Sequence, residues 1–224
     1  MIYILDTADL EAIRHCCRYY PIDGVTTNPS IIAKANTDFW KLVENIRGII
    51  GNDKMLHVQT TQTEAEKIIE EAVLLKERLG GEFYVKIPIC EEGLRAAAEL
   101  KKMNIGVTVT AVFTPAQALM AAKAGADFVA PYVNRLDNIL GDGTKVVGEI
   151  VEVLENYGLP CKVLAASFKN SQQVHECSLY GCHSVTVTYD VLKDLISHPM
   201  TDAAISGFEK DWKNVYGNKT ILDF

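Results

Sequence analysis

Eight short apolar runs, rich in β-branched residues, alternate with longer mixed segments along the 224-residue chain. Most of the runs are hydrophobic at consecutive positions, which is typical of parallel strands with both faces covered. We therefore predict eight strands, at residues 2–5, 24–27, 55–59, 83–89, 106–110, 128–133, 162–166 and 184–188.

The segments between these runs have the spacing of helices. In residues 114–125, Thr114 suits a helix cap, Pro115 suits the first turn and Gly125 suits the end. Helical spacing recurs at residues 64–79, 93–103 and 146–156. Repeated strand-then-helix units predict an α/β fold, a single (β/α)8 TIM barrel over residues 1–224. An open doubly wound sheet is the alternative, although no G-x-G-x-x-G follows the first predicted strand.

The chain continues beyond the eighth predicted strand for longer than one closing helix requires. Residues 202–216 place Phe208, Trp212 and Tyr216 at near-helical spacing, and residues 221–224 form an apolar tail. Either this helix packs on its own barrel, or residues 202–224 contact a neighbouring subunit, since exposed apolar stripes mark interfaces.

The composition is that of an ordinary soluble globular protein, with 48% hydrophobic and 23% charged residues. The net charge of −7 argues against nucleic acid or an anionic membrane as a partner, but a few local cations suffice for a phosphorylated substrate. Residues 1–6 lack the pattern of a signal peptide, and no run approaches 18 apolar residues. Six cysteines without CxxC spacing favour free thiols, so we expect a cytoplasmic protein.

Lys86 interrupts the apolar strand predicted at residues 83–89. A buried ammonium is costly unless it is paired or its pKa falls, and a lowered pKa increases the fraction of neutral amine. The neutral amine can attack a carbonyl and form a Schiff base. The alternative is a strand-edge lysine that faces solvent.

Other polar residues lie where the predicted strands end. Active sites of barrels lie at the carboxyl ends of several strands at once. Asp6 has the alternative role of capping the first helix, and Asn28 that of shaping the turn before Pro29. The set comprises Asp6, Thr26, Asn28, Gln59, Thr110, Tyr132, Asn134, Arg135, Ser167 and Lys169.

Lys86 lies in an apolar strand, and carboxylate, amide, hydroxyl and phenol groups lie at the neighbouring strand ends. This arrangement suits amine catalysis on a ketone, in which an iminium accepts electrons while a C–C bond breaks. Arg135 and Lys169 are suited to hold a substrate phosphate. A metal-dependent aldolase is one alternative, but His57, His175, His183 and His198 match no strong zinc pattern. A non-catalytic phosphosugar-binding barrel, in which Lys86 has no chemical role, is another.

Five blocks of the chain resemble motifs of the transaldolase family: residues 6–8, 24–30, 85–88, 130–135 and 165–169. The similarity runs in order along essentially the whole chain, and it implies a Schiff base on Lys86. Transaldolases typically have glutamate at the position of Gln59, phenylalanine at that of Tyr132 and arginine at that of Lys169. The chain is therefore more similar to the small fructose-6-phosphate aldolase branch, with transaldolase activity as the alternative.

This resemblance also implies roles for the polar set. Gln59, Thr110 and Tyr132 would hold a catalytic water, with Tyr132 as the acid/base, and Asp6 would assist proton transfers. Thr26 and Asn28, which share a strand face, would bind the three-carbon dihydroxyacetone donor. The phosphate ligands would be Arg135, Ser167 and Lys169. The family implies no cofactor and no metal, and a homo-oligomeric ring, typically a pentamer that stacks into a decamer.

Overall fold

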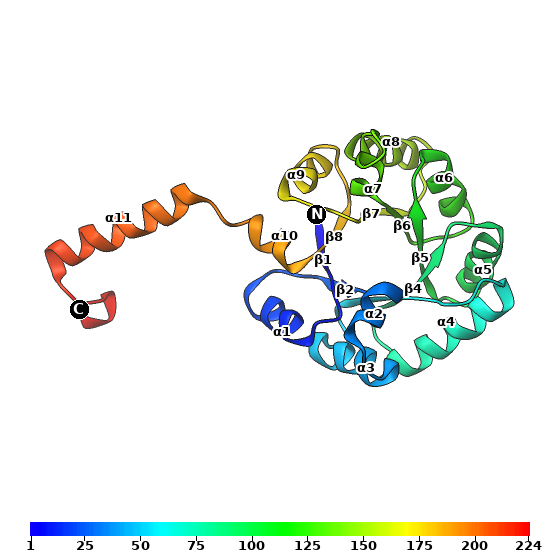
Figure 1. The fold of residues 1–224 in the computed structure, drawn as a ribbon, viewed down its shortest axis with the longest axis horizontal. Coiled ribbons are helices and arrows are strands. Elements are labelled where there is room, and N and C mark those ends of the chain that lie inside the picture. Colours follow the sequence, from blue (N-terminus) through cyan, green and yellow to red (C-terminus); the bar gives the residue numbers. More distant parts are fainter.

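The computed structural model describes all 224 residues and contains a closed barrel of eight parallel strands in sequence order (Figure 1). Each strand pairs with the next, and β8 pairs with β1. The predicted (β/α)8 barrel is confirmed, and the open-sheet alternative is wrong. The strands are β1 (Ile2–Asp6), β2 (Gly24–Thr26), β3 (Met55–Gln59), β4 (Phe83–Pro88), β5 (Gly106–Val112), β6 (Phe128–Pro131), β7 (Lys162–Ala165) and β8 (Ser184–Val187).

Helices surround the barrel, and all four of the helices predicted by spacing are present. Thr114 caps its helix as expected, with Pro115 in the first turn. The helices are α1 (Leu10–Tyr19), α2 (Pro29–Ala35), α3 (Phe39–Ile50), α4 (Ala65–Leu79), α5 (Glu91–Lys102), α6 (Pro115–Lys123), α7 (Val133–Asp137), α8 (Gly143–Asn156), α9 (Ser171–Leu179), α10 (Tyr189–Asp194) and α11 (Pro199–Tyr216). The 3-10 turn η1 (Ile221–Asp223) follows.

Two strand ends differ from the prediction. β6 stops at Pro131, because Tyr132 makes only an isolated bridge to Ala166 before the chain turns into α7. Asn134 and Arg135 therefore belong to a helix and not to a strand end. β7 stops at Ala165, so Lys169 lies four residues beyond its strand.

The two faces of the barrel strands have different side chains. The outward face is apolar and packs against the helices, with Leu5, Val25, Val58, Val85, Val107, Val129, Val163 and Val185 essentially inaccessible to solvent. Inside the barrel, a small apolar cluster of Ile4, Phe128 and Leu164 fills the end where the strands begin. The rest of the interior holds buried polar side chains, namely Thr26, His57, Lys86, Thr108, Thr110 and Thr186. The interior polarity is concentrated toward the carboxyl ends of the strands.

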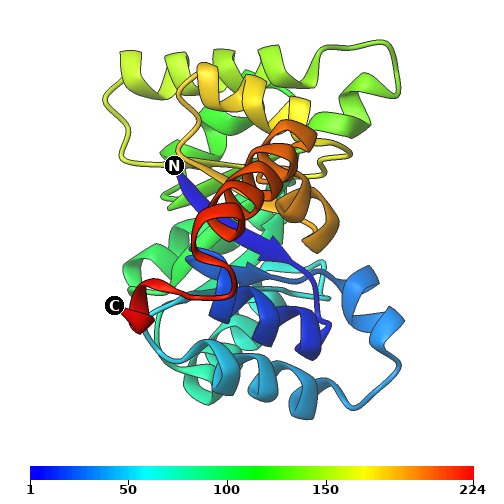
Figure 2. The same ribbon diagram turned by 90° about the vertical axis from the view of Figure 1, so that its left-hand side faces the viewer.

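α11 extends away from the barrel and carries η1 and the C-terminus at its far end (Figures 1 and 2). None of its residues is buried, and Phe208 is 73% exposed. Within this arm the Trp212 and Tyr216 rings are 4.6 Å apart, and Tyr216 also packs edge-on against Phe224. The alternative in which this helix packs on its own barrel is therefore wrong. No helix has the length and apolarity needed to cross a membrane.

Candidate active site

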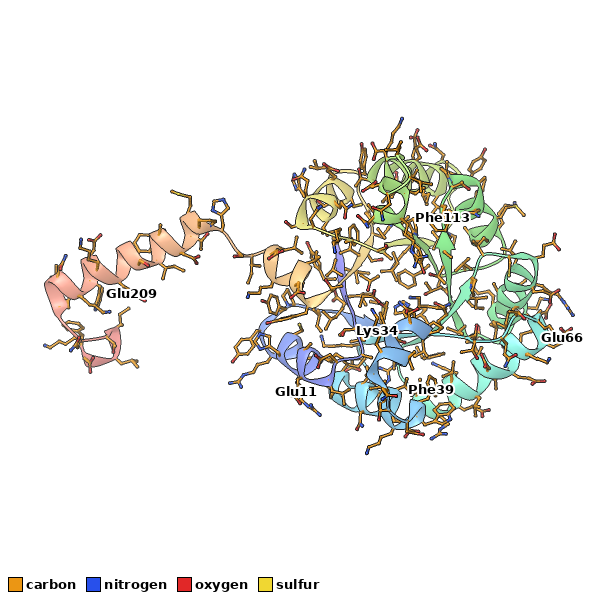
Figure 3. All side chains as sticks on the ribbon, viewed as in Figure 1. Glu11, Lys34, Phe39, Glu66, Phe113 and Glu209 are labelled. Carbon is orange, nitrogen blue, oxygen red and sulfur yellow. The ribbon has the colours of Figure 1, made fainter.

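A cavity of about 920 Å³ opens at the carboxyl ends of the barrel strands. In Figure 2 the arrow of β1 points to the side on which α2 lies, and Lys34 of α2, labelled in Figure 3, lines this cavity. Of the ten residues to which the family resemblance gives a role, seven line it: Asp6, Asn28, Gln59, Lys86, Tyr132, Arg135 and Ser167. Thr26 and Thr110 lie directly behind the wall and bond residues of it. Lys169 is exposed and does not contribute to the lining.

Lys86 is only 4% exposed and reaches into the cavity from β4. Its Nζ donates one hydrogen bond, to the carbonyl oxygen of Thr27 at 3.1 Å. Burial lowers the pKa of the Lys86 amine, and the charge of Asp6 partly opposes that shift. The solvent-facing alternative for Lys86 is wrong. This environment favours a neutral, nucleophilic amine.

Asp6 is held by a chain of hydroxyl groups from the neighbouring strands. Thr26 Oγ1 donates to Asp6 Oδ1 at 2.7 Å, and Thr186 Oγ1 of β8 lies 2.6 Å from Thr26 Oγ1. Because Thr26 has one proton to give, Thr186 must donate to it. Burial raises the pKa of Asp6, while Lys86 and the Thr26 bond oppose this effect.

The first helix is capped by Asp9, whose carboxylate accepts from the backbone amides of Glu11 and Ala12. The alternative role for Asp6, capping this helix, is therefore wrong. Asn28 does cap α2, through the Ile31 amide at 3.0 Å, and it also lines the cavity. Its side-chain NH₂ makes no hydrogen bond within the protein and is free to donate to a ligand.

Tyr132 lies on the opposite wall from Asp6, just after β6. Its hydroxyl is 3.1 Å from Thr110 Oγ1 on β5. The Phe113 ring packs edge-on against it at 5.6 Å, and the Arg135 guanidinium lies 4.8 Å from the centre of the tyrosine ring. The phenol is thus oriented from three directions. Gln59 lies beside Lys86, because β3 pairs with β4 at these two residues.

Ser167 and Ala111 line the cavity with left-handed backbone angles, at φ 63° and 59°. Non-glycine residues adopt this conformation at a cost of order 1 kcal/mol or more, and they cluster at functional sites. At Ala111 the turn coincides with a shift of register between β5 and β6. Beyond this irregularity, the Val112 carbonyl accepts from the amide of Tyr132.

Sequence reasoning also missed other polar residues of the wall, among them Lys34, Thr186 and Thr188. Lys34 brings a second cation to the mouth from α2, while Thr186 and Thr188 bring hydroxyls from the end of β8. Thr186 lies on the same strand face as Ser184, so strand alternation could have found it. The sequence around Lys34 does not predict that it lines the cavity, because its position depends on how α2 packs against the barrel.

The four histidines that could be offered as metal ligands lie in separate places. His57 is inside the barrel, His175 is on α9, His183 precedes β8, and His198 caps α11. No group of three or more His, Cys, Asp or Glu side chains is arranged to hold a metal ion.

Several solved structures share this fold at low sequence identity. A flavocytochrome b2 variant with benzoylformate is 14% identical, with a TM-score of 0.61 over 85% of this chain, which spans 57% of that protein's length. A structure described as native KDPGal is 17% identical, with a TM-score of 0.59 over 84% of this chain and 82% of its own. A cube-shaped, highly porous designed protein cage is 15% identical, with a TM-score of 0.60, and the match covers 96% of this chain and 77% of the cage chain. These identities show the fold alone.

The sequence comparison is more specific than the structural one. The profile of the transaldolase/fructose-6-phosphate aldolase family matches residues 3–219, a range that includes every site residue predicted from the sequence. The buried Lys86 and the polar carboxyl end of the barrel agree with that match. The chain belongs to the transaldolase/fructose-6-phosphate aldolase family.

Proposed function

We propose that the protein is a class I aldolase that reversibly cleaves fructose 6-phosphate into dihydroxyacetone and glyceraldehyde 3-phosphate through a Schiff base on Lys86. The observation that supports this most is a lysine 4% exposed, with one hydrogen bond, in the wall of a cavity of about 920 Å³. A lysine with this burial and so few partners is costly for stability and suited to nucleophilic catalysis.

The reaction begins when the neutral Lys86 amine adds to C2 of the ketose and gives a carbinolamine. Loss of the C2 hydroxyl as water then yields the iminium. Asp6 is close enough to influence the Lys86 amine electrostatically, and its raised pKa suits it to give and take these protons.

Cleavage follows when a base removes the C4 hydroxyl proton and the C3–C4 electron pair moves to the iminium, which becomes an enamine. Tyr132 serves as this base, directly or through a water held with Gln59 and Thr110. The 3.1 Å contact between Thr110 and the phenol supports this role. Protonation of the enamine at C3 and addition of water at C2 then release dihydroxyacetone and regenerate Lys86.

The substrate spans the cavity between two walls. Asn28 presents its NH₂ to the donor hydroxyls, next to Thr26 and Asp6. Arg135 and Ser167 bind the phosphate at the other side of the mouth. Lys169, which the structure places outside the lining, acts on the phosphate only at longer range, and Lys34 is the second cation at the mouth.

Aldolase and transaldolase activities share this chemistry up to the enamine. Gln59 and Tyr132 support the aldolase reading, because a water-binding phenol favours hydrolytic release of the three-carbon unit. The test is to incubate the purified protein with fructose 6-phosphate, alone and with erythrose 4-phosphate, beside a Lys86→Met control. We expect free dihydroxyacetone in both cases. Transfer to erythrose 4-phosphate much faster than release would make it a transaldolase, and binding without either reaction would make it a phosphosugar-binding barrel.

We further propose one domain over residues 1–224, with residues 202–224 at a subunit interface of a homo-oligomeric ring, a pentamer or decamer. Exposed apolar side chains on the arm support this, among them Phe208, Val215 and Leu222. Sedimentation analysis should give a multimer, and truncation after residue 198 should yield smaller species. The six free cysteines support a cytoplasmic location.

A further inference from the structure

Below Lys86, the barrel interior contains a buried polar pair that the reaction steps do not use. His57 of β3 and Thr108 of β5 are both inaccessible to solvent, and His57 Nδ1 lies 2.9 Å from Thr108 Oγ1. The remaining ring nitrogen, Nε2, has no hydrogen-bond partner. A fully buried polar atom without a partner is rare and costly, so its retention calls for an explanation.

Strand register places this pair against Lys86. His57 pairs with Tyr84 on β4, and Thr108 pairs with Lys86 on the same strand. The His57–Thr108 contact therefore crosses the inward face of β4 between Tyr84 and Lys86. The imidazole stacks on Tyr84 with centroids 4.8 Å apart and meets Phe128 edge-on at 5.4 Å, so its position is fixed.

The imidazole is uncharged in this place. Burial, together with repulsion from Lys86, lowers the pKa of His57 to about 3. The ring therefore does not carry a positive charge at neutral pH. What it supplies is a fixed neutral dipole within a part of the barrel whose neighbouring positions, Ile4, Phe128 and Leu164, are apolar.

We propose that His57 and Thr108 are positioning residues that lie below Lys86 and whose dipoles keep its cationic forms, ammonium and iminium, tolerable in the buried site. The inference deepens the proposed function and rests on it for the iminium. A cation in an apolar interior is stabilised by nearby dipoles, and an apolar replacement increases the cost of its charge.

Other groups around the Lys86 amine also affect its titration. On the remaining elements that face it, the neighbours are hydroxyls and one carbonyl, from Thr26, Thr27, Thr110 and Thr186. The titratable and charged groups are Asp6 from β1, His57 from β3 and Tyr132 after β6, with Tyr84 below the imidazole. At the mouth of the cavity they are Asp9, Lys34 from α2 and Arg135 from α7. Asp6 favours the charged amine, so the effect of His57 must be measured with Asp6 left intact.

The test measures the titration of Lys86 without using its activity. The folded protein is reductively methylated with ¹³C-formaldehyde, and the Lys86 methyl signal, assigned by its absence in Lys86→Met, is followed against pH. His57→Phe keeps a ring for the stack and removes both nitrogens. In His57→Phe we expect the titration midpoint of the Lys86 amine to fall by about one pH unit. Thr108→Val should shift it the same way by less, and Tyr84→Phe, which keeps the stacked ring, should leave it unchanged.

An unchanged or raised midpoint in both His57→Phe and Thr108→Val would overturn the inference, and so would an equal shift in Tyr84→Phe, which would mark a general packing effect. If His57→Phe fails to fold, Thr108→Val decides alone. The acid limb of kcat/KM should move with the midpoint, which a merely structural pair would not cause. A protein that never forms a covalent adduct refutes the proposed function, while the titration still tests this inference.

Discussion

Each end of the barrel holds one buried cation, and the two have opposite surroundings. Arg47, 7% exposed, lies where β3 and β4 begin and donates to the carbonyls of Gly51, Lys54 and Glu82. Lys86, 4% exposed, lies near the carboxyl ends and donates to one carbonyl at 3.1 Å.

The difference separates structural from functional burial. A guanidinium that satisfies three loop carbonyls stabilises the fold and stays charged. An ammonium with a single bond beside an open cavity is poorly stabilised, and its proton is lost more easily. Both side chains are cations, so the sign of the charge does not separate their roles. The number of hydrogen-bond partners does.

The largest expected effect is on catalysis at the carboxyl end. Lys86→Met removes the nucleophile and should reduce cleavage of fructose 6-phosphate by about four orders of magnitude or more. Because only one hydrogen bond is lost and a buried amine is replaced by an apolar chain, the free energy of unfolding should change by about 1 kcal/mol or less. Steady-state assays and urea unfolding measure both. A large loss of stability would make Lys86 as structural as Arg47.

The reverse pattern is expected at the other end. Arg47→Met removes a donor from three carbonyls, of which that of Glu82 keeps its bond from the Leu56 amide, and should lower the free energy of unfolding by about 3 kcal/mol. Activity per folded molecule should be unchanged. Arg78→Met is the matched control, since exposed Arg78 pairs with Glu44 at the surface and should cost about 1 kcal/mol or less. Equal costs for the two arginines would contradict the comparison.

Tyr132→Phe tests the acid/base at the functional end. It removes the hydroxyl that contacts Thr110 but keeps the ring between Phe113 and Arg135. We expect kcat to fall about 100-fold or more with little change in KM or thermal stability. A variant with near-normal kcat would exclude the phenol from proton transfer.

Lowering the pH should reduce the free energy of unfolding, because His57 is protonated more readily in the unfolded chain than in the folded barrel. Its folded pKa of about 3 lies below the ordinary 6.5, so the unfolded chain binds a proton that the folded chain rejects. This contribution is fully present above pH 6.5 and is lost as pH falls toward 3, by about 2 kcal/mol at pH 5. His57→Phe should therefore show a flatter dependence of unfolding free energy on pH between 7 and 5 than the unsubstituted protein. Parallel curves would refute the neutral buried imidazole.

The smallest effect is expected at Thr186. Thr186→Val removes the donor to Thr26 while keeping side-chain volume, and it should reduce kcat about tenfold or less by loosening Asp6. Thr188→Val, on the same strand end but outside this chain of hydroxyls, is the control. A larger loss at Thr188 than at Thr186 would argue against the hydroxyl chain.

Strand positions and Lys86 were predictable because buried parallel strands are apolar at consecutive positions, and a lysine within one stands out. The end of β6 could not be predicted in this way. Tyr132 and Val133 continue the apolar run of the sequence, although the pairing of β6 with its neighbours stops at Pro131. His57 shares the strand face of Gln59, so alternation places it inside the barrel, but its contact with Thr108 crosses β4 and depends on strand register. Lys34 and Lys169 depend on helix and loop paths, which local sequence does not determine.

The central claim is that Lys86 forms a covalent bond with the ketose carbonyl. The most direct measurement is to treat the protein with fructose 6-phosphate and borohydride, then locate any mass increase by peptide mapping. The account predicts a reduced three-carbon adduct on Lys86 and none in Lys86→Met. An unmodified Lys86 with saturating sugar phosphate, or an adduct confined to another lysine such as Lys34, would contradict it.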